Sequence, residues 1–123
     1  MNKIFLNISN HPSKNWSPEQ TKAAHLHGEL IVDMKPPLID PGASAEDIFN
    51  LAQEFILSVP ENTRCAMIST EYTFTFALVS LLQKNGITCV AATTERTILE
   101  DKNGVKTSIF SFIQFREFLS LRN

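Results

Sequence analysis

The feature that most constrains the fold is the regular alternation of short apolar runs with longer segments of helical periodicity. Apolar runs predict strands at residues 3–9, 29–34, 64–69 and 87–92. Helical patterns fill the intervals at residues 17–28, 44–59 and 70–86. Strands that alternate with helices form mainly parallel sheets with helices on both faces. We therefore predict a single α/β domain over residues 1–123.

Capping residues mark the expected helix boundaries. Ser17 has the side chain of an N-cap, and Gly28 is expected to end the first helix. The third helix is expected to begin at Ser69 or Thr70 and to end at the Asn-Gly pair of residues 85–86. The middle of this third helix is apolar nearly all round, which indicates burial on more than one side.

The alternation stops after the fourth predicted strand. There the stretch VAATTER, residues 90–96, passes from apolar residues to two hydroxyls, an acid and a base. Residues 95–101 and 105–115 flank a Lys-Asn-Gly turn and predict an antiparallel β-hairpin. Asn103 and Gly104 suit a tight turn with positive φ. The predicted fold is therefore a mainly parallel sheet that ends in an antiparallel hairpin.

Composition and charge exclude several classes of partner. The formal net charge of -2 provides no basic field for long nucleic acid or an anionic membrane. No apolar run is long enough to span a bilayer, and the first residues do not form a signal peptide. Cys65 and Cys89 lie in predicted buried strands without metal-ligand spacing, so free thiols are expected. These features together predict a cytoplasmic protein.

Polar side chains gather where three of the predicted strands end. The carboxyl ends of parallel strands share one edge of a sheet, where ligands bind at the point of reversal in strand order. The polar residues at these ends are Ser9, Asn10 and His11, then Ser69, Thr70, Glu71 and Thr73, and finally Thr93, Thr94, Glu95 and Arg96. We therefore expect these side chains to face one shared pocket.

The chemistry of this expected pocket suits a phosphate-containing ligand. Helix N-termini and hydroxyl groups donate hydrogen bonds to phosphate, and Lys14, Arg96 and Arg116 carry positive charge. Histidine can move a proton near neutral pH, which makes His11 a candidate acid or base. The sequence contains no GxGxxG motif, no P-loop and no cluster with metal-ligand spacing, so no cofactor and no metal is expected.

Simpler interpretations remain open for the same residues. Residues 93–96 also suit an ordinary strand or an exposed hairpin, and His11 also suits a loop. Trp16 suits a hydrophobic staple before the first helix as well as a surface on which a base could stack. The phenylalanines of residues 110–118 suit a sheet core or a dimer face better than a base-stacking platform.

Three segments carry a resemblance to a known family. They are NISNHPSKNWSPEQ at residues 7–20, STEYTFTFALVSLLQKNGI at 69–87 and VAATTERTILEDKNGVKTSIFSFIQFREF at 90–118. Together they resemble the small stand-alone CRISPR-associated proteins of type III systems, which are relatives of the Rossmann-like CARF domains and include ring nucleases. The resemblance implies a CARF-like α/β fold, a homodimer, and cyclic oligoadenylate as the ligand.

The resemblance also implies roles for the matching residues. In such a ring nuclease a ribose 2′-hydroxyl attacks the adjacent phosphorus without a metal and leaves a 2′,3′-cyclic phosphate. His11 is then the candidate general base or acid, Glu71 an alternative proton acceptor, and Arg96 the residue that stabilises the transition state. The other implied ligand-binding residues are Ser9, Asn10, Thr73, Thr93, Thr94, Glu95 and Arg116.

The leading functional hypothesis is a ring nuclease that degrades cyclic oligoadenylate. The alternative is a non-catalytic sensor or sponge for the same ligand. A third hypothesis is an interaction subunit whose aromatic hairpin docks onto another protein. The first two differ in whether the ligand is consumed, and the third predicts that no nucleotide binds.

Overall fold

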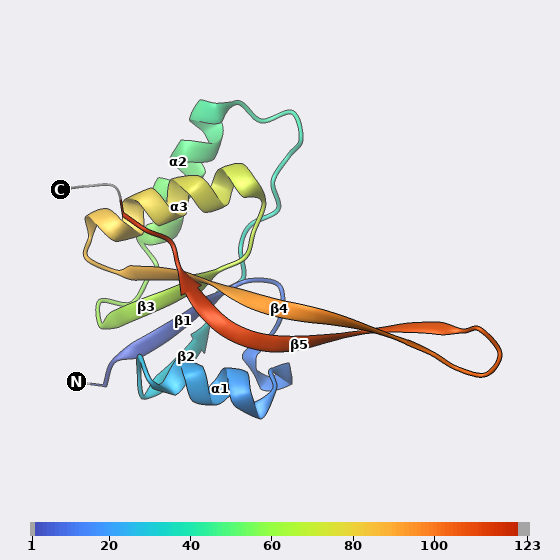
Figure 1. Cartoon of the computed structure of the whole chain (residues 1–123). Helices are drawn as coiled ribbons and strands as arrows, with labels where there is room; N and C mark the ends of the chain where they lie inside the picture. The colour runs from blue at the N-terminus through green and yellow to red at the C-terminus, as the bar shows by residue number, and fades with distance from the viewer. Residues whose placement is uncertain (1, 121–123) are drawn as a thin grey trace.

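Figure 1 shows the computed structural model of the chain, which describes residues 2–120. Within these residues the chain forms five β-strands, three α-helices and one short 3-10 helix. In chain order they are β1 (Ile4–Ile8), the 3-10 helix Ser13–Asn15, α1 (Pro18–His25), β2 (Leu30–Asp33), α2 (Ala45–Ile56), β3 (Thr63–Ile68), α3 (Tyr72–Lys84), β4 (Thr88–Glu100) and β5 (Lys106–Glu117). The predicted order of strands and helices is confirmed.

The strands form one mixed sheet in the order β2-β1-β3-β4-β5. β1 pairs in parallel with β2 and β3, and β3 pairs in parallel with β4. β4 and β5 are antiparallel. Helices α2 and α3 cover one face of the sheet and α1 lies on the other (Figure 1). The predicted α/β class, with a mainly parallel sheet and a final antiparallel hairpin, is confirmed.

β1 is buried along its whole length because it lies in the centre of a sheet that is covered on both faces. Ile4, Leu6 and Ile8 belong to the cluster that packs under α2 and α3. Phe5 belongs to the cluster on the α1 face, against which Trp16 packs. Such a continuous apolar run is typical of a central parallel strand.

The two cysteines are buried free thiols, as predicted. Cys65 belongs to the cluster on the α1 face, and Cys89 belongs to the cluster under α3. Burial raises the pKa of both thiols to about 12. Both thiols therefore stay protonated at neutral pH and are poor nucleophiles.

Side-chain caps begin the first two helices where the sequence places them. Ser17 Oγ accepts a hydrogen bond of 3.2 Å from Gln20 N at the start of α1. Ser44 and Asp47 form a reciprocal capping box at the start of α2. These hydrogen bonds satisfy backbone groups that the helix itself leaves unpaired.

The N-terminus of α3 is capped differently from the prediction. Neither Ser69 nor Thr70 is the N-cap; that position belongs to Glu71. Glu71 Oε1 accepts hydrogen bonds of 2.9 Å from the backbone N–H groups of Thr73 and Phe74. A carboxylate binds two N–H groups at once and carries the charge that a helix N-terminus favours, so it displaces the shorter hydroxyls.

The end of α1 also differs from the prediction. α1 ends at His25 with Leu26 as its C-cap, so Gly28 does not end the helix. A Cβ atom at Gly28 would lie 2.8 Å from both Lys3 O and Phe5 N. Glycine is therefore required here because the chain crosses directly against the backbone of β1.

The end of α3 agrees with the prediction. Gly86 has a φ of +80°, which glycine adopts without strain. The N–H groups of Gly86 and Ile87 donate hydrogen bonds of 3.0 Å to the carbonyls of Gln83 and Leu82. This paired arrangement is a Schellman motif, and it stops the helix at the Asn-Gly pair.

β4 is much longer than predicted. It continues to Glu100 instead of ending at Ala92, so residues 93–96 lie inside the strand. Its pairing with β3 ends at Val90, and beyond that residue β4 pairs only with β5. The two strands leave the sheet as a two-stranded ribbon that projects far from the body of the molecule (Figure 1). We call residues 94–112 of this ribbon the arm.

A β-bulge lies where the arm begins. Thr93 pairs with Gln114, whereas Thr94 pairs with Phe112, so Ile113 is an extra residue on β5. The strand that carries the extra residue bends and twists more strongly at such a bulge. The bulge therefore marks the point at which β4 and β5 turn away from the sheet.

The turn at the tip of the arm differs in detail from the predicted one. Of the Asn103-Gly104 pair, Gly104 alone has a positive φ, of +79°. Asp101 Oδ1 accepts hydrogen bonds of 2.8 Å from Asn103 N and 2.9 Å from Val105 N. The aspartate side chain therefore holds the turn in a form that leaves Asn103 in an ordinary conformation.

α3 is buried on two sides, against the sheet and against α2, as predicted, but its outer side is exposed. Phe74, Leu78 and Leu82 are buried against the sheet and α2. On the outer side, Tyr72 is 90% exposed and Phe76 is 76% exposed. The apolar character all round the helix thus reflects a core face and an uncovered apolar face.

The two glycines discussed above provide a matched stability test. We expect Gly28→Ala to lower the free energy of unfolding by ~3 kcal/mol or more, because the new methyl group meets backbone that cannot rotate away. Gly86→Ala should cost only about 1 kcal/mol, since its Cβ meets no atom within 4 Å and the cost is conformational. Urea denaturation followed by circular dichroism measures both, and equal losses would contradict the close approach at Gly28.

Candidate functional site

A pocket opens at the carboxyl ends of the central strands. The chain leaves β1 toward β2 on one side and continues through β3 on the other, so strand order reverses between β1 and β3. Open α/β sheets bind their ligands in the crevice at this point. The pocket has a volume of about 290 Å³, near the lower end of the range for small-molecule sites. Its walls are His11, Trp16, Gln20, Met67, Ile68, Ser69, Ala91, Ala92 and Thr94.

A buried amide fixes the loop that carries His11. Asn7 is 1% exposed, and its Nδ2 donates hydrogen bonds of 2.8 Å to His11 O and 3.0 Å to Asp33 Oδ1. Ser9 Oγ donates a 2.7 Å hydrogen bond to Asn7 Oδ1 and accepts one of 3.1 Å from His11 N. The predicted ligand-binding residue Ser9 is therefore buried beneath the loop, where it orders the loop and does not line the pocket.

Asp33 connects the end of β2 to the same loop. Its Oδ2 accepts a hydrogen bond of 3.1 Å from the backbone N–H of Ser13. Partial burial works to raise the pKa of Asp33, but the hydrogen bonds from Asn7 and Ser13 outweigh it and hold the pKa below its ordinary value. The ionised carboxylate therefore stabilises the loop at neutral pH.

Three of the polar residues expected at the strand ends meet in the pocket. His11 comes from the loop after β1, Ser69 from the end of β3, and Thr94 from the start of the arm. Asn10 is exposed in the same loop as His11. The sheet thus brings an imidazole and two hydroxyls to the edge at which the sequence predicts a ligand.

Glu71 and Thr73 lie at the N-terminus of α3 and do not line the pocket. The Thr73 hydroxyl donates a hydrogen bond to the Glu71 carboxylate. That hydrogen bond, followed by the one from the Phe74 N–H, holds the pKa of Glu71 below its ordinary value. The N–H groups that the sequence assigns to phosphate are therefore satisfied by the chain's own carboxylate, which is also a weaker base than usual.

Arg96 lies on the arm, two residues beyond Thr94. Its Nε donates a 3.2 Å hydrogen bond to Ser108 Oγ across the ribbon. Glu95 projects from the opposite face of the ribbon, because successive strand residues alternate. Arg96 is thus held by Ser108, on the face of the ribbon away from Glu95.

Thr93 and Arg116 lie where the arm joins the sheet. Thr93 Oγ1 donates a hydrogen bond of 3.2 Å to the backbone carbonyl of Gln114. Arg116 is exposed on β5, the edge strand, opposite Ala91. Neither predicted residue belongs to the pocket wall.

A row of aromatic rings lies beside the pocket and begins at Trp16, for which the sequence left two interpretations open. Trp16 lines the pocket, and its ring centroid lies 6.1 Å from those of Phe5 and Phe115. The rings of Phe112 and Phe115 continue this row, with centroids 4.9 Å apart. Trp16 therefore packs on the sheet while one side of the residue faces the pocket.

Gln20 and Met67 are pocket residues that the sequence did not indicate. Gln20 Nε2 lies 3.9 Å from Met67 Sδ, so α1 and β3 meet at the pocket floor. Gln20 also belongs to the first turn of α1, and Met67 to the buried strand β3. Their place in the pocket depends on how α1 lies across the sheet, which no local pattern specifies.

The chain belongs to the uncharacterized protein MJ1673 family, whose sequence model matches residues 3–116. The matched region includes every strand and helix of the structure up to Arg116 in β5. No curated protein matches the chain, and no solved structure matches it. Within residues 2–120, no helix is long and apolar enough to cross a membrane.

The Asp33 hydrogen bonds predict an acid-sensitive loop. Because the pKa of Asp33 is lowered in the folded state, its contribution to stability is complete above the unfolded value of 3.8 and is lost as the pH falls through the lowered pKa. The chain's single tryptophan reports on this region. We expect Trp16 emission to shift to the red below about pH 4 before far-UV circular dichroism changes. Asp33→Asn should show part of that shift already at pH 7, and an unshifted spectrum would contradict the assigned role.

Proposed function

We propose that the protein is a CARF-like ring nuclease that binds cyclic oligoadenylate at the pocket and cleaves it without a metal. The observation that carries this proposal is the meeting of His11, Ser69 and Thr94 beside Trp16 at the strand-order reversal. The description of the matched family names no activity, so the proposal rests on this geometry and on the resemblance of the sequence segments.

The arm offers a surface that continues from the pocket. Thr94 is opposite Phe112 and Arg96 is opposite Phe110, so these four side chains share one face of the ribbon. A step of two strand residues covers about 7 Å, which an extended arginine side chain can span. Once it leaves Ser108, the Arg96 guanidinium can therefore reach a phosphate at the mouth of the pocket. The rings beside it offer surfaces on which bases stack.

The proposed reaction needs only groups of this kind. His11 takes the proton from a ribose 2′-hydroxyl, and the 2′-oxygen forms a bond to the adjacent phosphorus. The bond from phosphorus to the 5′-oxygen breaks, and that oxygen takes a proton from solvent, which leaves a 2′,3′-cyclic phosphate and a 5′-hydroxyl. Arg96 stabilises the additional charge on the phosphoryl oxygens.

A direct assay tests the proposal. The purified protein is mixed with cyclic tri-, tetra- or hexa-adenylate in EDTA, and the products are resolved by chromatography and mass spectrometry. We expect linear products with 2′,3′-cyclic phosphate ends from the preferred ring. Binding is followed in the same samples by Trp16 fluorescence, since this tryptophan lines the pocket.

Each other outcome of the assay has a distinct meaning. Intact rings together with a saturable change in Trp16 fluorescence would contradict the nuclease and support a sensor or sponge. Intact rings without any fluorescence change would contradict both, and would favour an interaction subunit that uses the apolar arm.

Two substitutions separate catalysis from binding. His11→Ala should slow cleavage by roughly 10²- to 10⁴-fold and leave the dissociation constant nearly unchanged, because the imidazole acts on the proton. Arg96→Ala should weaken binding by about ten- to a hundredfold and slow cleavage as well, because a charged hydrogen bond to phosphate is lost.

Two matched controls make the result specific. His25→Ala removes an imidazole at the opposite end of the strands from the pocket, near the starts of β1 and β3. Lys102→Ala removes a positive charge from the tip of the arm. Neither control should change binding or cleavage. Normal cleavage by both His11→Ala and Arg96→Ala would contradict the site assignment.

A further inference from the structure

The outer face of α3 is an apolar surface that the described part of the chain leaves uncovered. Tyr72, Phe76 and Ser80 lie four residues apart along the helix and form a ridge on this face. Tyr72 is 90% exposed and Phe76 is 76% exposed. Two adjacent aromatic rings at this exposure are uncommon on the surface of a soluble monomer, where large apolar patches mark interaction sites.

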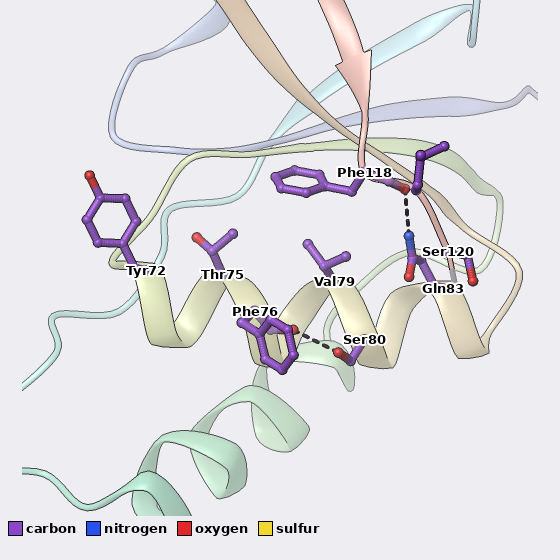
Figure 2. Close-up of a pocket in the computed structure, with 9 residues that line it drawn as sticks. Tyr72, Thr75, Phe76, Val79, Ser80, Gln83, Phe118 and Ser120 are labelled. Atoms are coloured by element: carbon purple, nitrogen blue, oxygen red, sulfur yellow. Dashed lines mark hydrogen bonds between the residues drawn. The ribbon is translucent and has the colours of Figure 1, made fainter. Parts of the chain in front are cut away.

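A hollow lies on each side of this ridge. The first, of about 500 Å³, lies between α3 and the segment that follows β5, and Figure 2 shows the Phe118 ring facing Val79 across it. The second, of about 530 Å³, lies between α3 and the start of α2. Tyr72, Phe76 and Ser80 line both hollows, so the ridge and the hollows form one continuous surface.

None of the residues among 2–120 that line the two hollows is charged. They are Tyr72, Thr75, Phe76, Val79, Ser80, Gln83, Phe118, Leu119 and Ser120 in the first, and Ala43, Ala45, Ile48, Phe49, Tyr72, Thr73, Phe76, Ala77 and Ser80 in the second. Depletion of charge and enrichment in aromatic residues distinguish the centre of a protein interface from ordinary surface. Among these described residues, a nucleic acid or another strongly charged partner would find no complementary charge.

We propose that this face binds the same face of a second copy of the chain. An interface around a two-fold axis requires a surface that is complementary to itself. The α3 face meets this requirement because it carries protruding rings and, beside them, hollows large enough to receive such rings. The ridge of each copy then lies in a hollow of the other, as neighbouring helices pack ridges into grooves.

The exposed area reaches the lower limit for a specific dimer interface. Besides the two rings of the ridge, Leu119 is 81% exposed and Phe49 is 44% exposed at the rims of the hollows. Aromatic side chains bury about 150–250 Å² each, so at these exposures the three rings together with Leu119 offer on the order of 500 Å² per copy. Two copies would bury about 1,000 Å², which is the size at which a specific interface becomes plausible. The inference does not depend on cyclic oligoadenylate, since it uses no residue of the pocket.

The oligomeric state in solution tests the inference. Phe76→Arg places a charge at the centre of the proposed interface, and the position is exposed, so the fold should be retained. Gln53→Arg introduces the same group on the exposed side of α2 and serves as the matched control. Leu99→Arg does the same on the arm, where Leu99 is 53% exposed. Sedimentation velocity and light scattering give the mass, and circular dichroism checks the fold.

We expect the unaltered chain and both controls to be dimers, with a measured mass twice that of one chain. Phe76→Arg should sediment as a monomer, with the dissociation constant raised at least a hundredfold. A monomeric unaltered chain would overturn the inference, as would a Phe76→Arg variant that stays dimeric. Dissociation by Leu99→Arg alone would also overturn it, because the arm would then hold the copies together.

Discussion

The central position of β1 is the constraint on which the rest of the structure depends. Its residues are buried from both sides, so helices must cover both faces of the sheet. Because β1 is central, the chain must place β2 on one side of it and β3 on the other. The reversal creates the crevice at its carboxyl end. Near that end lie two polar residues, Asn7 in β1 and Ser9 directly after it, whose hydrogen bonds support the loop of the pocket.

Local patterns in the sequence predict most of the fold. Alternating apolar runs and helical periodicity predicted each strand and helix, because each repeat follows directly from the element's geometry. The length of β4 could not be predicted in this way. A strand inside a sheet and a strand inside a free ribbon share the same period of two, and only the partner on the other edge differs. The stretch VAATTER is where β4 loses that partner.

The site was predicted less completely than the fold, for a different reason. His11, Ser69 and Thr94 reach the pocket because strand ends of a parallel sheet share one edge. Glu71 is equally close to a strand end, yet its carboxylate is attracted first to the N–H groups of its own helix. Sequence position alone does not reveal which competing hydrogen bond a polar side chain will make. Trp16 could be assigned only after the packing of α1 against the sheet was known.

The single extra residue at the bulge determines which way the arm presents its side chains. In a regular strand, Phe112 and Phe115 would project from opposite faces, because they are three residues apart. The insertion of Ile113 into β5 shifts the alternation by one, and the two rings come into contact. The aromatic row of the core thereby continues onto the arm. A one-residue insertion or deletion at this point would exchange the two faces of β5 in the arm without altering a single residue of the arm itself.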